Sequence, residues 1–209
     1  LGDVYKRQLH VNMWDPHTPY DTPKEFGNPF KNDPIEDWVT EELIKKQRDS
    51  FGPHSAREVP GFDDDLRGKY TMGVGEIKNI ADAKEQFDAY DTGINYADLY
   101  LSKVIEDLKK MNLWDDTAII ISADHGENQG ELNVWGDHQT ADHITNRVPL
   151  IIRWPGITDS NKGNTVEKKF YNLDLTSTIS QIVSSTQPDR WDGINFSDNL
   201  KDNKSKNGR

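Results

Sequence analysis

A carboxylate and an imidazole stand side by side at Asp124 and His125, directly after a short apolar run at residues 118–121. A β-branched run of this length is typical of a buried strand, and open α/β sheets place ligands at the carboxyl ends of their strands. A carboxylate oxygen and an imidazole nitrogen both offer lone pairs to a divalent cation. The pair therefore indicates a metal site, although an Asp-His-Gly turn that closes a strand is the simpler interpretation of the tripeptide alone.

His17 is the next candidate for chemistry, because two prolines fix the loop around it. Pro16 and Pro19 exclude a helix and make the segment stiff and extended. A histidine on a rigid loop after a strand is well placed to bind a ligand. A plain proline-rich turn remains the simpler interpretation of this segment taken alone.

His138 and His143 each follow an aspartate, and each could form a local pair with it. Their separation does not match two histidines one helical turn apart, and neither a His-Glu-x-x-His nor a Gly-x-Ser-x-Gly pattern occurs in the chain. Zinc protease chemistry and a serine nucleophile on a strand-to-helix elbow are therefore poorly supported. Isolated surface histidines are common, so each of the two also has a structural explanation.

Apolar runs and helical periods predict the elements that position these side chains. Strands are expected at residues 9–14, 118–121, 148–154 and 165–171. Helices are expected at residues 34–46 with Asp33 as N-cap, at 77–111, and at 174–185 with Asp174 as N-cap. Residues 51–75 and 127–137 are expected to be loops, and the first could wall a substrate cleft. A helix that leads into a buried strand is half of a βαβ unit, which favours an α/β fold.

The composition excludes several classes of function. The chain has 209 residues, 33% of them hydrophobic, and a mean hydropathy of -0.86. No apolar run approaches the length that spans a bilayer. The net charge of -11 argues against a general nucleic-acid binder. Since the chain has no cysteine, it contains no disulfide, no thiolate metal ligand and no cysteine nucleophile.

The two ends of the chain have an unusual composition. Residues 1–8 do not look like the start of a mature protein or like a signal peptide, and we interpret them as a non-native read-through scar. We expect residues 9–200 to form the folded part of the chain. Residues 198–209 are rich in Asn, Lys, Asp and Ser and are expected to fray, with 201–209 as a disordered tail.

Several segments occur in one order along the chain. Residues 14–20 carry the Pro-His-Thr-Pro loop, residues 112–126 run from the helix exit through the strand, and residues 124–127 read Asp-His-Gly-Glu. Residues 147–156 read Arg-Val-Pro-Leu-Ile-Ile-Arg-Trp-Pro-Gly, and residues 191–196 read Trp-Asp-Gly-Ile-Asn-Phe. This ordered set resembles the sulfatases of the alkaline phosphatase superfamily, with Asn195 where serine is usual. The resemblance covers about residues 9–200 and implies that they are a partial sulfatase catalytic domain. The implied fold is an α/β, alkaline-phosphatase-like three-layer sandwich with a mixed, mostly parallel sheet, here incomplete.

The resemblance also implies roles for individual residues. Asp124 and His125 would be ligands to a divalent cation, usually Ca²⁺. His17 would hydrogen-bond the sulfate or the leaving oxygen. His138 falls where the family has a sulfate-contacting lysine, so it would be a catalytic and substrate-binding residue, with Asp137 or a substrate oxygen as its partner. His143 has no clear counterpart and is the weakest substrate-binding candidate.

The mechanism implied by the resemblance is nucleophilic displacement at sulfur by a formylglycine hydrate, which is made from a Cys/Ser-x-Pro/Ala-x-Arg motif. That motif and the family's Asp-Asp metal pair are absent from the chain, and we expect both upstream of His17. The expected activity is hydrolysis of a sulfate ester, of a carbohydrate in particular, by the full-length enzyme. The chain alone is expected to be inactive.

Two alternatives stay open. One is a phosphodiester or phosphonate hydrolase of the same superfamily, and the other is a non-catalytic binding domain with this fold. The expected partner is a sulfated small molecule or glycan, with no nucleic acid and no membrane span. The family resemblance also implies a periplasmic or secreted location.

Overall fold

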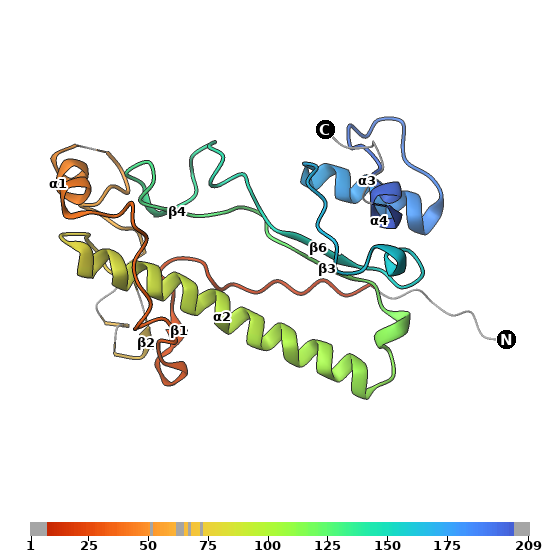
Figure 1. Ribbon diagram of the computed structural model, residues 1–209, viewed down its shortest axis with the longest axis horizontal. Helices are drawn as coiled ribbons and strands as arrows, with labels where there is room; N and C mark the ends of the chain where they lie inside the picture. Colours follow the sequence, from red (N-terminus) through yellow and green to blue (C-terminus); the bar gives the residue numbers. More distant parts are fainter. Residues whose placement is uncertain (1–7, 51, 62–64, 67, 72, 203–209) are drawn as a thin grey trace. The chain divides into compact units, whose positions relative to one another are not determined.

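The structure is a computed structural model that describes residues 8–50, 52–61, 65–66, 68–71 and 73–202 (Figure 1). The chain divides into two compact units. Unit 1 comprises Leu1–Glu106 and Glu127–Thr145, and unit 2 comprises Asp107–Gly126 and Asn146–Arg209. Residues 1–7 of the expected scar and residues 203–209 of the expected tail lie outside the described ranges, and so does part of the 51–75 loop.

Unit 1 contains helices and short strand pairs. Its elements are β1 (Thr22–Pro23), η1 (Lys24–Phe26), α1 (Glu41–Asp49), β2 (Tyr70–Thr71), α2 (Ile80–Lys110, of which residues up to 106 belong here), β4 (Asn128–Gln129) and β5 (Trp135–Asp137). Strand β1 pairs with β2, and β4 pairs with β5, both antiparallel. The segment 127–137, which we expected to be a loop, is therefore a β-hairpin.

Trp135 is the centre of the core of unit 1. Its ring is fully buried among apolar side chains that include Ile44 of α1 and Ile77, and it meets the edge of Phe87 of α2 with the ring centroids 6.2 Å apart. The indole Nε1 donates to Gln47 Oε1 at 3.0 Å, which satisfies the one polar atom of the ring. Trp135 thus anchors the β4–β5 hairpin on the two helices.

The long helix α2 confirms the prediction for residues 77–111 to within three residues (Figure 1). Asn79 caps its start, since the side-chain oxygen of Asn79 accepts from the backbone N–H of Asp82 at 3.1 Å. Gly93 does not end the helix. A Cβ at Gly93 would stand 2.9 Å from Pro16 Cβ, so the glycine lets the loop that carries His17 approach the helix closely.

The predicted start of α1 is wrong. We expected the helix to begin at Pro34 behind Asp33, but it begins at Glu41 behind Thr40. The Thr40 side-chain oxygen accepts from the backbone N–H of Leu43 at 3.1 Å, which makes Thr40 the true N-cap. Residues 34–40 instead run as turns and coil, and they bury Val39 in the core.

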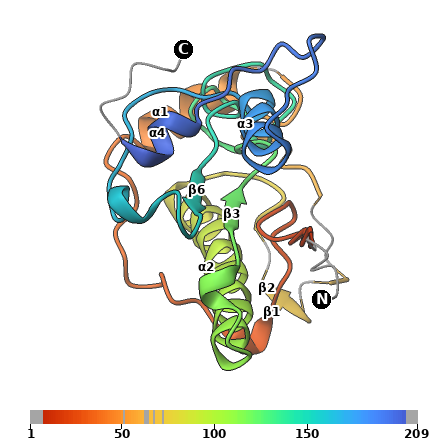
Figure 2. The same cartoon turned by 90° about the vertical axis from the view of Figure 1, so that its right-hand side faces the viewer.

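Unit 2 is built around two paired strands. Its elements are η2 (Trp114–Asp116), β3 (Ile119–Ser122), β6 (Leu150–Arg153), η3 (Asp159–Asn161), α3 (Asn172–Ser184) and α4 (Ser197–Lys201). Figure 2 shows β3 and β6 side by side, and they pair antiparallel from Ile119 opposite Arg153 to Ser122 opposite Leu150. The three strand pairings in the described part of the chain are all antiparallel, and the expected parallel pairs are not among them.

The β3–β6 pair is less buried than its sequence predicted. None of its residues is fully buried, and Ile151 is 58% exposed. Arg153, the last residue of β6, holds the segment that leads into β3, because its guanidinium donates to the carbonyl oxygens of Trp114 at 2.6 Å and Thr117 at 3.0 Å. The strands at 118–121 and 148–154 are thus confirmed in position.

Two predicted strands are not formed. Residues 9–14 and 165–171 have no strand partner in the described ranges, and Leu9 is 82% exposed. An alternating or apolar pattern becomes a strand only when a neighbour takes up its backbone hydrogen bonds. The helix predicted at 174–185 is confirmed as α3, but Asp174 is its third residue and not its cap. Fraying was expected from residue 198, and this is wrong for residues 198–201, which lie in α4.

Candidate functional site

His17 lies on a tight turn of unit 1. Its backbone N–H donates to the Trp14 carbonyl and its own carbonyl accepts from the Tyr20 N–H, both at 3.0 Å. The Trp14 ring stacks on the imidazole with the centroids 4.3 Å apart. His17 Nδ1 lies 2.7 Å from the Thr18 carbonyl oxygen. Because a carbonyl oxygen only accepts, this contact places a hydrogen on Nδ1, so Nε2 is the nitrogen at which His17 takes up or gives a proton.

Tyr20 fixes this turn to the rest of unit 1. Its side chain is fully buried, and its hydroxyl oxygen accepts from Gln129 Nε2 of β4 at 2.6 Å, across 109 positions in the sequence. Gly136 of β5 lies against the same turn, since a Cβ there would stand 3.1 Å from Thr18 Cγ2 and 3.3 Å from the Tyr20 hydroxyl. The φ of 64° at Gly136 also favours glycine. The turn and the hairpin are therefore packed directly together.

The β4–β5 hairpin places His138 opposite Glu127. Asn128 pairs with Asp137 in the antiparallel register, so the next positions outward, 127 and 138, are cross-strand neighbours. His138 Nδ1 lies 3.4 Å from Glu127 Oε1, and the backbone N–H of His138 donates to Asp137 Oδ1 at 2.8 Å. The sequence indicated Asp137 or a substrate oxygen as the partner of His138. In the structure Asp137 bonds the His138 backbone, while Glu127 faces the ring.

The structure brings His17 and His138 together. Their rings meet edge to face with the centroids 5.4 Å apart and an interplanar angle of 69°. Both side chains are partly exposed, in contrast to the buried Tyr20 and Glu127 beneath them. Two imidazoles from distant parts of the sequence can therefore contact one ligand at the surface of unit 1. Imidazole is the side chain most often used to transfer a proton in catalysis.

Two buried carboxylates lie behind this pair. The side chains of Glu127 and Asp137 are 4% and 7% exposed. Burial, and then the charge of Asp137, raise the pKa of Glu127 to about 8. Burial and the nearby Glu127 charge also raise the pKa of Tyr90 to about 12. His54 approaches Asp137 from a third segment, with its Nε2 3.7 Å from Asp137 Oδ2.

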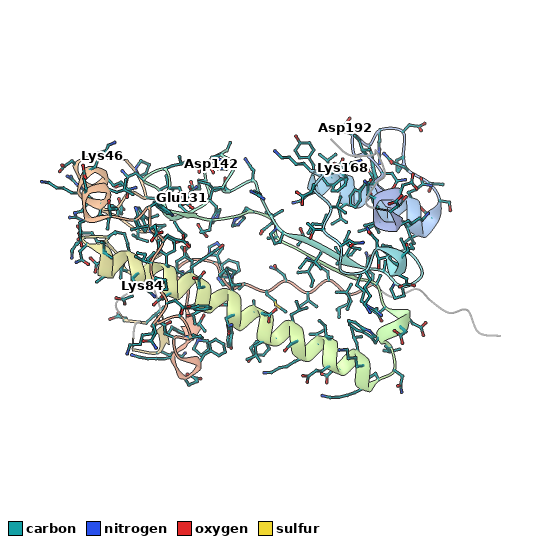
Figure 3. All side chains as sticks on the ribbon, in the orientation of Figure 1. Lys46, Lys84, Glu131, Asp142, Lys168 and Asp192 are labelled. Atoms are coloured by element: carbon teal, nitrogen blue, oxygen red, sulfur yellow. The ribbon has the colours of Figure 1, made fainter. Side chains whose placement is uncertain are left out.

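Asp142 and His143 have a different place in the structure. Asp142 stabilises the loop after the hairpin, because it accepts from the Thr140 hydroxyl at 2.5 Å and from the backbone N–H of Ile144 at 2.7 Å. These hydrogen bonds, chiefly that of Thr140, hold the pKa of Asp142 below its usual range. Figure 3 shows Asp142 and Glu131 on the segment that carries the hairpin and this loop. His143 is exposed, and the expected Asp142–His143 pair is not formed.

Asp124 and His125 belong to unit 2, directly after β3. The Asp124 side chain is 90% exposed and accepts the backbone N–H of His125 at 3.1 Å. His125 Nδ1 lies 2.8 Å from the Gly126 carbonyl, which places a hydrogen on Nδ1. Metal-binding histidines usually donate their second nitrogen to such an acceptor, and this orients the ring.

The Asp124–His125 pair fits part of a cation site. His125 Nε2 and Asp124 Oδ1 are 3.8 Å apart, a separation that two ligands of one cation allow when metal–ligand bonds are about 2.0–2.5 Å long. A carboxylate has about four lone-pair positions, so one backbone hydrogen bond leaves it able to bind a cation. Within the described ranges, no group of three or more His, Asp or Glu side chains is arranged to hold a metal ion. The pair therefore offers two donors, which is fewer than the four or more ligands that a bound cation usually takes.

Residues 8–185 match the profile of the Sulfatase family. This chain belongs to the sulfatase family. Among curated relatives, it is 27% identical over 191 residues to choline-sulfatase of Rhizobium meliloti (strain 1021), which covers 90% of the chain and 34% of that protein. It is 26% identical over 178 residues to human iduronate 2-sulfatase, covering 84% of the chain and 31% of that protein. The chain thus spans about a third of the length of these sulfatases.

Solved structures share the fold of this sulfatase-family chain. A phosphonate monoester hydrolase from Silicibacter pomeroyi matches with a TM-score of 0.71 and 24% identity, over 93% of the chain and 37% of the hydrolase. A protein in complex with its substrate D-glucosamine-2-N,6-O-disulfate matches with a TM-score of 0.70 and 15% identity, over 93% of the chain and 48% of that protein. The expected alkaline-phosphatase-like α/β fold is confirmed. Among the described residues, no helix combines the length and apolar content that crossing a bilayer requires.

Sequence reasoning did not single out Tyr20, His54 or Glu127. Glu127 was noted only as the last residue of the Asp-His-Gly-Glu segment, and its place opposite His138 follows from a hairpin that we expected to be a loop. In the sequence, Tyr20 is simply the last residue of the proline-rich loop at residues 14–20. One signal in the sequence could have predicted the hairpin. It is a turn with a glycine that lies between Asn128-Gln129 and Trp135-Gly136-Asp137.

Proposed function

We propose that this chain is part of a sulfuric ester hydrolase, in which His17 and His138 contact the sulfate ester and give a proton to its leaving oxygen. The edge-to-face contact of the two imidazoles, in a chain that belongs to the sulfatase family, carries this proposal. A ligand at the two rings meets two Nε2 atoms, and each of them donates a hydrogen bond to a sulfate oxygen when its ring is protonated. Either ring can give a proton to the alkoxide that leaves, a contribution of typically 10²–10⁴-fold in rate.

The two histidines have supports of different kinds. The Thr18 carbonyl holds the hydrogen on His17 Nδ1, and Trp14 holds the plane of the ring. The buried Glu127 faces His138 Nδ1. The Thr18 carbonyl, and Glu127 when it is ionised, accept from Nδ1, so each ring then exchanges protons at its Nε2 atom. Rings held in one orientation keep their donors aimed without reorganisation, which is the main requirement for stabilising charge on a leaving group.

Asp124 and His125 would hold a divalent cation, Ca²⁺ in the first place, together with ligands from outside this chain. The orientation of His125 by Gly126 and the exposed Asp124 carboxylate support this assignment. A bound cation supplies positive charge that offsets the sulfate oxygens and lowers the pKa of a nucleophile beside it. Oxygen donors favour Ca²⁺ and nitrogen donors favour transition metals, so one carboxylate and one imidazole do not select the metal. The remaining ligands determine which metal binds.

The nucleophile of the proposed reaction lies outside residues 1–209. The sequence holds no cysteine and no Ser-x-Pro/Ala-x-Arg motif, so a formylglycine cannot form within it. The proposed substrate is a sulfated carbohydrate. Relatives support this class, since an ulvan-active sulfatase of Formosa agariphila is 27% identical over 122 residues, which is 58% of the chain and 24% of that protein. The family also supports a location outside the cytoplasm for the complete enzyme.

The test uses the complete protein that contains residues 9–202, produced together with a formylglycine-generating enzyme. Release of sulfate from an aryl sulfate and from sulfated monosaccharides is measured with and without a chelator. We expect release that requires a divalent cation and that falls at least about 10²-fold in His17→Ala and in His138→Ala. His143→Ala is the comparison, because His143 is exposed and no contact with either ring is recorded for it. It should retain the wild-type rate, which would remove His143 as a substrate-binding candidate.

The same assay decides between this function and the alternatives. A phosphonate monoester is offered beside the sulfate esters, because the fold is shared with phosphonate monoester hydrolases. The chain is also 24% identical over 189 residues to the multifunctional alkaline phosphatase superfamily protein PehA of Trinickia caryophylli. Faster release from the phosphonate would replace the sulfatase proposal. Binding of a sulfated glycan without turnover of any ester would indicate a binding domain.

A further inference from the structure

We propose that Glu127 is the positioning residue of His138: it holds the ring proton on Nδ1 and fixes the face that His138 presents beside His17. This inference rests on the proposed function, because it assigns a role within the same site. It stands on the geometry of the β4–β5 hairpin and on the burial of the Glu127 side chain.

The hairpin leaves Glu127 and His138 little freedom to separate. They are the first cross-strand neighbours beyond the Asn128–Asp137 pair, and Glu127 Oε1 lies 3.4 Å from His138 Nδ1. Two further contacts hold the strands in place. Gln129 of β4 donates to the buried Tyr20 hydroxyl, and Trp135 of β5 fills the core of unit 1. The cross-strand distance is therefore set by the core and not by a mobile side chain.

The Glu127 carboxylate cannot turn to solvent. Its side chain is only 4% exposed, whereas the side chain of His138 is 25% exposed. A buried carboxylate needs a partner, because an unpaired buried acceptor costs about 1–3 kcal/mol. The imidazole of His138 is the partner that the structure records for it. The arrangement resembles the carboxylate that orients a histidine in other catalytic sites, where it selects the tautomer and the ring plane.

Asp137 has a different task in the same cluster. It bonds the His138 backbone through Oδ1 and faces His54 Nε2 through Oδ2 at 3.7 Å, so it fixes the chain and not the ring. Glu131 is the acidic neighbour on the hairpin turn, where its carboxylate accepts from the Gln129 backbone N–H at 2.7 Å. Glu131 is exposed and makes no recorded contact with His138, which makes it a matched control for the loss of a carboxylate.

The first test reads the proton on His138 directly. Nitrogen NMR of the full chain, labelled with ¹⁵N-histidine, is recorded near pH 9, where a neutral imidazole has one proton to place. His138→Gln assigns the signals. We expect wild-type His138 to carry its proton on Nδ1, and Glu127→Gln to shift the population toward the Nε2 tautomer. Glu131→Gln should leave the spectrum unchanged. A wild-type His138 protonated on Nε2 overturns the proposal by itself, whatever the variants do.

The second test uses the complete, formylglycine-containing enzyme. Glu127→Gln should lower kcat by about 10–100-fold with little change in KM, the usual size of an effect that acts through an oriented ligand or base. Glu131→Gln should match the wild type. A wild-type kcat for Glu127→Gln in an active enzyme overturns the positioning role. If the complete enzyme hydrolyses no sulfate ester, the proposed function fails, and the NMR result alone decides the role of Glu127.

Discussion

The two candidate sites differ in how their residues come together. Asp124 and His125 are neighbours in the sequence, and their contacts with each other and with Gly126 need only a local turn. His17 and His138 meet only because unit 1 folds, through contacts such as that of Tyr20 with Gln129 across 109 positions. Proximity that a fold must create is stronger evidence for a site than proximity that the sequence supplies.

Burial separates the two sites in the same way. Buried carboxylates lie behind His138, whereas the Asp124 side chain is 90% exposed. Substitutions in unit 1 should therefore change both stability and the arrangement of the site. Substitutions of the Asp124–His125 pair should change the binding of a cation and little else. The free energy of unfolding is the quantity in which this contrast between the two sites should appear.

The largest effect is expected for Trp135→Ala. Removing a fully buried indole leaves a cavity and a Gln47 amide oxygen without its donor, so the free energy of unfolding should fall by about 3–5 kcal/mol. The measurement is urea denaturation followed by circular dichroism. The ring contact between His17 and His138 should disappear from NOE spectra.

Trp191→Ala is the control for this change. Trp191 lies in unit 2 and is 36% exposed, so its loss should cost far less. Equal destabilisation by the two substitutions would mean that Trp135 is not the anchor of the hairpin.

Glu127→Gln should change how stability depends on pH. The folded state raises the pKa of Glu127 from 4.5 to about 8, so it keeps a proton that the unfolded chain has lost between those two values. The stabilisation by this group is fully present below pH 4.5 and is lost as the pH rises through 8. Across that window the wild type should lose about 2–4 kcal/mol more than the variant.

Urea denaturation at pH 5 and pH 8.5, in buffers without divalent cations, measures this difference. Glu131→Gln should follow the wild-type curve, because Glu131 is exposed. Parallel curves for the wild type and Glu127→Gln would show that Glu127 is not protonated by its burial and by Asp137.

The parts of the fold that sequence predicted well are those with local causes. Helix α2 follows from apolar residues at three- and four-residue steps, and β3 and β6 follow from two apolar runs. The start of α1 was wrong because both Asp33-Pro34 and Thr40-Glu41 are capping signals, and only burial of Ile44 and Gln47 selects the second. The β4–β5 hairpin was missed because its strands have two and three residues, too few to show a period.

The candidate site shows the same limit. The resemblance to the sulfatases predicts four site residues, His17, His138, Asp124 and His125. Their spacing in the sequence does not predict that His17 and His138 lie close together. The cause of their proximity is tertiary, and it lies in Tyr20, Gln129 and the close packing at Gly136. Glu127 could not be recognised as the partner of His138, because a single slip in hairpin register would place it on the other face.

Tyr20→Phe should have a smaller effect than either change above. The variant keeps the buried ring and its contact with Tyr90, whose centroid lies 5.4 Å away, but it leaves the Gln129 amide without the hydroxyl that accepts from it. We expect a loss of about 1–3 kcal/mol in the free energy of unfolding. The His17 turn should also loosen, which NMR order parameters of residues 16–20 would report.

Tyr100→Phe provides the control, since its hydroxyl is exposed and bonds only Tyr96 in the recorded contacts. A Tyr20→Phe protein as stable as Tyr100→Phe, with an unchanged His17 turn, would contradict the view that Tyr20 joins the turn to the hairpin.

The smallest effect on stability is expected for Asp124→Asn. This carboxylate is exposed, and its recorded contacts are with His125 alone, so the amide should change neither the unfolding curve nor the spectrum of unit 1. The matched change is Asp137→Asn, where a buried carboxylate that accepts from the His138 N–H is lost, and here we expect about 1–3 kcal/mol. If Asp124→Asn were the more destabilising of the two, the Asp124–His125 pair would be part of the folding core, and its assignment to a cation would lose its basis. Because the recorded contacts of Asp124 are with its sequence neighbour alone, its carboxylate contributes little to the stability of the fold and is available to bind a cation.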